Sequence, residues 1–175
     1  SVAARFDSVE RERGTPKLVV HTIDGRFAEI FRKDITDADP AHVAQVFENS
    51  ALSAFLVGQQ AARCMLRRDI PEGGQRGTIL YTNASAAIKG FPRSAAFAMA
   101  CHAKKSLAQS MARELGPKGI HVAQVPIDSA IGNTQEDGSR AHWLGGPAEE
   151  DNMADPDHIA ETYLHLNRQH RSTWA

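Results

Sequence analysis

The stretch SLAQSMARELGPKGIHVAQVPIDSAI, residues 106–131, predicts a helix that is followed closely by a strand, and the rest of the fold prediction builds on this pair. Three apolar residues recur at helical spacing and predict one buried stripe: Leu107, Met111 and Leu115. The helix is expected to begin after a capping Ser94 and to end at Gly116. The apolar run at 120–125 then predicts a buried strand that ends at Pro126.

The same alternation extends toward the N-terminus. Two more buried strands are expected at 18–23 (LVVHTI) and 78–82 (TILYT). Between them, Asp39-Pro40 opens a long helix over 40–68, which we expect to bend or restart near Asn49-Ser50. Further helices are expected at 2–13 and from Asp157. Strands that alternate with helices predict an α/β protein with a parallel sheet and right-handed crossovers.

In such a sheet, ligands bind beyond the carboxyl ends of the strands. Three strand ends are therefore expected to form one crevice, at residues 22–25, 83–85 and 127–131. The long segment 128–155 has no clear periodicity, and its length favours a functional loop that would act as a substrate lid. The glycine cluster at 73–77 precedes a strand, so we interpret it as a turn.

Composition excludes several classes of function. The 175 residues carry 20 basic and 21 acidic side chains, so the net charge of −1 argues against a nucleic-acid partner. No apolar run approaches the roughly 18 residues of a membrane span, and the N-terminal residues form an amphipathic pattern rather than a signal peptide. Two cysteines, Cys64 and Cys101, make neither a disulfide framework nor a zinc site, which predicts a reducing, cytoplasmic location and no metal.

Four segments resemble the short-chain dehydrogenase/reductase family. Residues 14–25, 51–66 (ALSAFLVGQQAARCML), 77–90 (GTILYTNASAAIKG) and 106–131 are similar to the family's central strands and helices. The resemblance implies a Rossmann-like, doubly wound parallel sheet in one domain over residues 1–175. It covers only the middle and later part of the family subunit, because the N-terminal βαβ cofactor unit with its G-x-G-x-x-G turn is absent from this sequence.

The family's catalytic positions are altered here. The family uses Tyr-x-x-x-Lys, and these two positions fall on Phe97 and Cys101. The catalytic serine falls on Ala84, with Ser85 one residue away, and the family's helix asparagine falls on Ser50. Since phenylalanine carries no proton and cysteine provides no fixed positive charge, we expect an impaired catalyst.

The resemblance also implies an NAD(P)-dependent oxidoreductase that acts on a small carbonyl or alcohol substrate. The residues expected to contact NAD(P) are Thr22, Ile23, Asp24, Gly25, Cys101 and Ile131. Because the pyrophosphate-binding turn is missing, binding by this chain is expected to be weak. The alternative hypothesis is a non-catalytic subunit or oligomerisation scaffold, since helices 40–68 and 94–115 form the interface of homodimers and homotetramers in the family.

Other residues have competing interpretations. Adjacent helical residues point about 100° apart, so Cys101-His102 is expected to be a buried cysteine beside an unrelated histidine rather than a reactive pair. His21 is expected to be structural, with a general base as the alternative. Asp24 is a candidate for polar contact with a ligand. Lys104 and Lys105 are interpreted as a solvated charge pair, with replacement of the missing family lysine as the alternative.

Overall fold

The computed structural model describes residues 1–70, 74–141 and 152–174. The chain forms two compact units, each described below by itself. The first contains Ser1–Ile127 and the C-terminal residues His170–Ala175, and the second contains Asp128–Gln169. Every strand of the main sheet belongs to the first unit.

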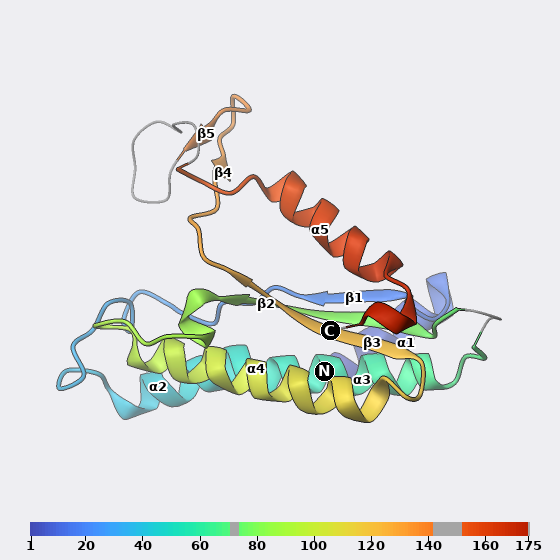
Figure 1. Ribbon diagram of the computed structural model, residues 1–175. Coiled ribbons are helices and arrows are strands. Elements are labelled where there is room, and N and C mark those ends of the chain that lie inside the picture. The colour runs from blue at the N-terminus through green and yellow to red at the C-terminus, as the bar shows by residue number, and fades with distance from the viewer. Residues whose placement is uncertain (71–73, 142–151, 175) are drawn as a thin grey trace. The chain divides into compact units, whose positions relative to one another are not determined.

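The main sheet is parallel, as predicted. It consists of β1 (Leu18–His21), β2 (Gly77–Ala84) and β3 (Ile120–Ile127), in that order (Figure 1). β1 ends earlier than the expected residue 23. β2 and β3 extend further than expected, because they pair along eight residues each. The prediction that β3 ends at Pro126 was therefore wrong by one residue. Proline is compatible with this position because β3 lies at an edge of the described sheet.

One layer of helices covers one face of this sheet (Figure 1). It contains α1 (Val2–Arg13), α2 (Pro40–Phe47), α3 (Ser53–Leu66) and α4 (Ala95–Leu115). Asp39 caps α2 by accepting a hydrogen bond from the Ala41 N–H at 2.8 Å, as expected. The predicted bend between α2 and α3 is a π-helical turn, η1 (Glu48–Leu52). Ser94 occupies the N-cap position of α4 but its side chain accepts no hydrogen bond there, so that capping prediction was wrong.

The main core lies between β2, β3 and these helices. Its buried members are Ala54, Ala61, Ala62, Met65, Ile79, Tyr81, Ala108, Leu115, Ile120 and Val122. The phenol of Tyr81 extends to α3, where its hydroxyl donates to the Ala54 carbonyl oxygen at 3.3 Å. Gly58 makes this approach possible, since a Cβ at that position would lie 1.9 Å from the Tyr81 hydroxyl oxygen. The small residues of α3 therefore serve packing against the sheet.

The C-terminal residues of the first unit contact β3. After η3 (Arg171–Thr173), the indole of Trp174 stacks on the imidazole of His121, with the ring centroids 4.8 Å apart and the planes nearly parallel. The second unit contains α5 (Pro156–Arg168), which is capped by Asp155.

The second unit also has structure where only a loop was expected. The short strands β4 (Asn133–Thr134) and β5 (Arg140–Ala141) form an antiparallel hairpin, and Ile131 makes a parallel bridge with Ala154. Residues 142–151 of the expected substrate lid lie outside the described residues. The lid role stays a prediction.

Candidate functional site

The segment after β1 turns sharply at Gly25, which has a φ of +87°. A Cβ at Gly25 would lie 2.7 Å from the Ser50 Cβ, so this glycine allows the turn to pack directly on η1. The Asn49 side-chain amide donates to the Gly25 carbonyl oxygen at 3.5 Å. The structure therefore brings Ser50 together with the 22–25 segment, and the Ser50 hydroxyl, fully buried, has no hydrogen-bond partner among the described residues.

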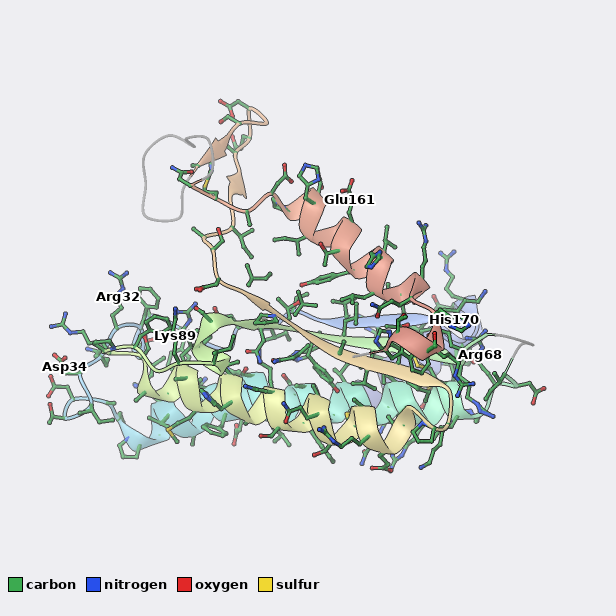
Figure 2. The ribbon with its side chains drawn as sticks, viewed as in Figure 1. Arg32, Asp34, Arg68, Lys89, Glu161 and His170 are labelled. Carbon is green, nitrogen blue, oxygen red and sulfur yellow. The ribbon has the colours of Figure 1, made fainter. Side chains whose placement is uncertain are left out.

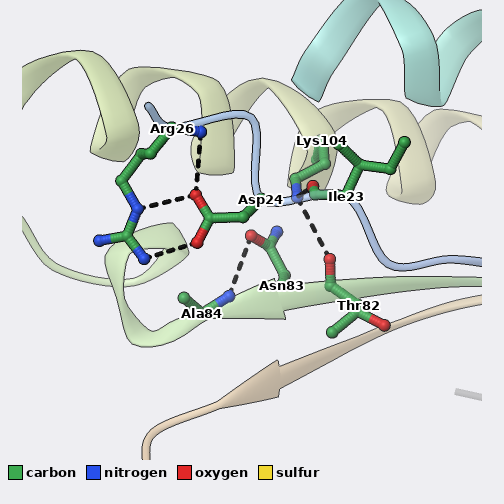
Figure 3. A network of polar contacts seen from close by, with 7 residues as sticks. All are labelled: Ile23, Asp24, Arg26, Thr82, Asn83, Ala84 and Lys104. Carbon is green, nitrogen blue, oxygen red and sulfur yellow. Dashed lines mark hydrogen bonds and ion pairs between the residues drawn. The ribbon is translucent and has the colours of Figure 1, made fainter. Parts of the chain in front are cut away.

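Asp24 pairs with a residue of its own turn. Its carboxylate accepts from Arg26 Nε at 2.7 Å and Nη2 at 2.5 Å, and also from the Arg26 backbone N–H (Figure 3). Burial opposes ionisation of this half-exposed carboxyl, but the hydrogen bonds and charge of Arg26 outweigh it and hold the pKa of Asp24 below its ordinary value. Asp24 is therefore an ionised ion-pair partner and not a proton donor at neutral pH.

Asn83 organises the end of β2. Its amide nitrogen donates to the Cys101 carbonyl oxygen and to Gln124 Oε1, both at 2.9 Å, while its oxygen accepts from the Ala84 N–H at 3.1 Å. These bonds join β2 to α4 and β3, and they fix the position of Ala84. The following 3-10 turn, η2 (Ser85–Ala87), begins at Ser85, whose hydroxyl makes no hydrogen bond with a described residue. The sequence predicted that Asn83 lies at the end of the strand, in the expected crevice, but not that it joins three elements.

Three residues on β2 and α4 that the resemblance implies as catalytic positions pack into one apolar cluster. Ala84, Phe97 and Cys101 pack together with Ala86, Ala87 and Ala98. Cys101 is fully buried, and that burial raises the pKa of its thiol. The Arg26 guanidinium carbon lies 3.8 Å from the centroid of the Phe97 ring, so the ion pair with Asp24 covers one face of the ring. The side chains of this cluster therefore provide only hydrocarbon groups and a protonated thiol, and the guanidinium beside them is already paired with Asp24.

Lys104 is buried, so the prediction that it is solvated was wrong. Its side chain is 2% exposed, and Nζ donates to the carbonyl oxygens of Ile23 at 3.1 Å and Thr82 at 3.3 Å (Figure 3). Burial lowers the pKa of Lys104, whereas the nearby Cys101 and Asp24 act in the opposite direction. Its neighbour Lys105 is half-buried, so the two lysines differ because of helix phase. The signal was present in the sequence, since position 104 shares a helix face with Ala100 and Ala108.

His21 is buried at the end of β1 and contacts α3. Its Nε2 lies 2.9 Å from the Ser53 hydroxyl, which donates its own proton to the Asn49 carbonyl oxygen at 2.5 Å. The hydroxyl therefore accepts from His21, which assigns the proton to Nε2 and leaves Nδ1 as a bare acceptor without a partner among the described residues. Burial, followed by the charge of Lys104, lowers the pKa of His21 from 6.5 to about 4.

The remaining candidates do not join this group. The His102 ring is exposed, and its Nδ1 lies 2.9 Å from the Ala98 carbonyl oxygen on its own helix, so it forms no pair with buried Cys101. Ile131 belongs to the second unit, and its expected contact with NAD(P) stays a prediction. In the described part of the chain, no three histidine, cysteine or acidic side chains are arranged to hold a metal, and no helix there is long and apolar enough to cross a membrane.

Exposed charged loops surround this end of the first unit. Figure 2 shows Arg32, Asp34 and Lys89 on the loops that follow β1 and β2, with Arg68 at the opposite end of the strands. Asp34 accepts a hydrogen bond from Arg93 Nε at 2.9 Å, which links the two loops. Both partners of this pair are more than half exposed, so it adds little stability.

Comparison with known proteins relates the whole chain to one group. The profile of a family described as enoyl-(acyl carrier protein) reductase matches residues 1–173. A short-chain dehydrogenase from Rhodopseudomonas palustris is similar in structure with a TM-score of 0.73 and 26% identity, over 99% of this chain and 65% of that one. No curated protein matches the chain by sequence.

Two more distant structures share the fold. The NADH-dependent enoyl-[acyl-carrier-protein] reductase of Aquifex aeolicus has a TM-score of 0.71 and 16% identity, over 95% of this chain and 60% of that one. The corresponding reductase of Anaplasma phagocytophilum, solved in complex with NAD, has a TM-score of 0.62 and 21% identity, over 78% and 48%. The chain thus spans less than two thirds of the length of each of these three proteins.

Proposed function

Because this chain belongs to the short-chain dehydrogenase/reductase family, we propose that it derives from an NAD(P)-dependent oxidoreductase of a carbonyl or alcohol and is itself catalytically impaired. One observation carries the proposal. Ala84, Phe97 and Cys101, which the sequence resemblance assigns to the family's serine, tyrosine and lysine positions, lie together in an apolar cluster. With that assignment, the site has the family's spatial arrangement but none of its three proton-handling side chains.

The chemistry of the cluster supports impairment. Reduction of a carbonyl needs a group that gives a proton to the developing alkoxide, and such a group contributes roughly 10²–10⁴-fold to the rate. Phe97 has no exchangeable proton, and the Ala84 side chain has no hydroxyl to orient a substrate. The Cys101 thiol is fully buried with a raised pKa. Asp24 is held ionised by Arg26, so it does not replace the lost acid.

The residues present fit a nicotinamide nucleotide only in part. The turn at Gly25 and the amino group of Lys104 lie at the carboxyl ends of β1 and β2, where the fold binds ligands. No glycine-rich turn that opens a helix is found among the described residues, so they contain no pyrophosphate site of this kind. We therefore propose that this chain binds NAD(P) weakly.

The test is restoration of the family residues. A variant with Ala84→Ser, Phe97→Tyr, Cys101→Lys and Lys104→Met replaces the apolar cluster with the family's proton-handling groups and leaves one lysine in the site. We expect consumption of NADH or NADPH with a panel of aldehydes and ketones to rise at least about 100-fold over the unchanged chain. The matched control omits only Phe97→Tyr and should show no gain. Saturable turnover by the unchanged chain would contradict the proposal.

A second candidate function is that of a non-catalytic subunit or scaffold in a homodimer or homotetramer. Large apolar side chains remain exposed on the helical layer: Leu52, Phe55, Leu56 and Met99. They lie on η1, α3 and α4, and burying such a patch against a second copy would be favourable. Sedimentation should show a dimer or tetramer that Phe55→Glu dissociates, whereas Ile35→Glu, on a loop, leaves it intact. A monomer at all concentrations contradicts the scaffold function.

For either function we propose a cytoplasmic location, because both cysteines are free and buried.

A further inference from the structure

Lys104 has a buried amino group, and it lies on α4 three residues after Cys101, the position that the resemblance assigns to the family's lysine. Lys104 is 2% exposed, and its Nζ binds two backbone carbonyl oxygens, that of Ile23 just beyond β1 and that of Thr82 near the end of β2 (Figure 3). No described carboxylate forms an ion pair with it, since Asp24 is bonded to Arg26. Lysine is rarely this deeply buried without a charged partner, because removing an ammonium from water is unfavourable. The contact with two strand ends is thus the feature that offsets this cost.

Cys101 lies one helical turn before Lys104 on the same face of α4. Residues three apart on a helix are neighbours, and both of these side chains are buried. Long helical side chains lean toward the N-terminus of their helix, so the lysine stem extends over the turn that contains Cys101. The small thiol leaves room for that stem. By the resemblance, position 101 is where the family places its lysine.

We propose that the ends of β1 and β2 enclose a single cation site, formed by the carbonyl oxygens of Ile23 and Thr82, and that Lys104 fills it in place of a lysine at position 101. Lys104 is a positioning residue. Its ammonium binds the first residues beyond β1 and so holds the 22–25 turn against β2. The site has therefore kept a positive charge although the family's lysine position has lost it.

The proposal predicts that lysines at 101 and 104 exclude each other. Two ammonium groups one turn apart in a buried site repel, and they compete for the same two oxygens. Cys101→Lys alone should therefore be strongly destabilising. Lys104→Met alone should also destabilise, because it removes the donor of two hydrogen bonds, those to the Ile23 and Thr82 carbonyl oxygens. In the double variant the new lysine takes the vacated site, so most of both losses should disappear.

The experiment is thermal unfolding of the four chains, with Lys105→Met as the matched control. We expect each single change to lower the Tm by about 5 °C or more, and the double variant to lie closer to the unchanged chain than either single variant. The control should shift the Tm by less than about 2 °C, since Lys105 is half-buried and makes no described hydrogen bond. Additive losses in the double variant would overturn the proposal.

A measurement on the unchanged chain covers the case in which a variant does not fold. Nuclear magnetic resonance of the lysine side-chain nitrogens should show one ammonium with slowly exchanging protons at neutral pH. That signal should be absent from Lys104→Met and present in the double variant. Only fast-exchanging lysine signals, or a neutral amine at Lys104, would overturn the single cation site.

The functional part of this inference rests on the proposed function. NADH and NADPH titrations should show at least about tenfold weaker binding by Lys104→Met than by the unchanged chain, with recovery in the double variant and no change in Lys105→Met. If the unchanged chain binds no nucleotide, proposed cofactor binding fails, while the unfolding and resonance results still decide the cation site. Equal binding by the unchanged chain and Lys104→Met overturns the positioning role of Lys104.

Discussion

Replacing Gly58 by alanine tests how the helical layer packs on the sheet. A Cβ at Gly58 would lie 1.9 Å from the Tyr81 hydroxyl oxygen and 3.0 Å from the Met111 Cε. Met111 ends in a flexible side chain that can move, but Tyr81 is fully buried and its hydroxyl bonds to the Ala54 carbonyl oxygen. Overpacking of this kind costs about 1–3 kcal/mol, and such a short contact places Gly58→Ala near the upper limit.

The gain in helix propensity opposes this cost. Alanine is better than glycine inside a helix by about 1 kcal/mol, so the net destabilisation by Gly58→Ala should be about 2 kcal/mol. Tyr81→Phe removes the clashing oxygen and costs about 1 kcal/mol for the lost hydrogen bond. In the Tyr81→Phe background, Gly58→Ala should then be neutral or stabilising by up to about 1 kcal/mol. The predicted coupling between the two sites is therefore roughly 2–3 kcal/mol.

Urea unfolding of the four chains measures this coupling, provided that the m-value is unchanged. Gly90→Ala is the matched control, because nothing lies within 4 Å of a Cβ there, and its effect should stay within about 0.5 kcal/mol. Equal destabilisation by Gly58→Ala in both backgrounds would refute the close approach of Tyr81 to α3.

Three further predictions follow from groups in or near the site. The pKa of His21 is about 4 in the folded chain and 6.5 when unfolded, so the unfolded state binds the proton first, and the free energy of unfolding should fall by roughly 3 kcal/mol as the pH drops from about 6.5 to 4. His21→Gln should remove this pH dependence, and an unchanged slope in that variant would show that His21 does not cause it. Cys64 and Cys101 are buried, and burial raises the pKa of both thiols, so iodoacetamide should modify them only at the rate at which the chain unfolds. Faster labelling of the folded chain would be inconsistent with their burial. Asp24→Asn should change the free energy of unfolding by less than about 1 kcal/mol, because both partners of the Asp24–Arg26 pair are partly exposed. A larger decrease of this free energy in urea unfolding would show that the ion pair is structurally essential.

The sequence predicts the order of elements and the parallel sheet well, because periodicity and turn residues are local signals. The helix bend at η1 and the Asp39 cap lie where the pattern places them, and all three predicted strands are present, although their ends differ from the predicted ones. The two-residue strands β4 and β5 were missed, since such short strands leave no periodicity.

Side-chain environments in the site were harder to predict. Lys104 was interpreted as solvated because it adjoins Lys105, and only its helix phase distinguishes the two. The pairing of Asp24 with Arg26, two residues away, was not predicted from the sequence, and the expected contact of Asp24 with a ligand stays a prediction. Asn83 joins three elements through contacts that depend on how β2, β3 and α4 pack, and no local pattern encodes them.

We propose that Ala84, Phe97 and Cys101 occupy the family's catalytic positions without its proton chemistry. The decisive measurement is steady-state oxidation of NADH and NADPH by the purified chain, over a broad range of aldehydes and ketones. We expect rates equal to those of a blank without protein at every pH tested. A saturable rate that Phe97→Ala or Cys101→Ala abolishes would show that the proposal is wrong.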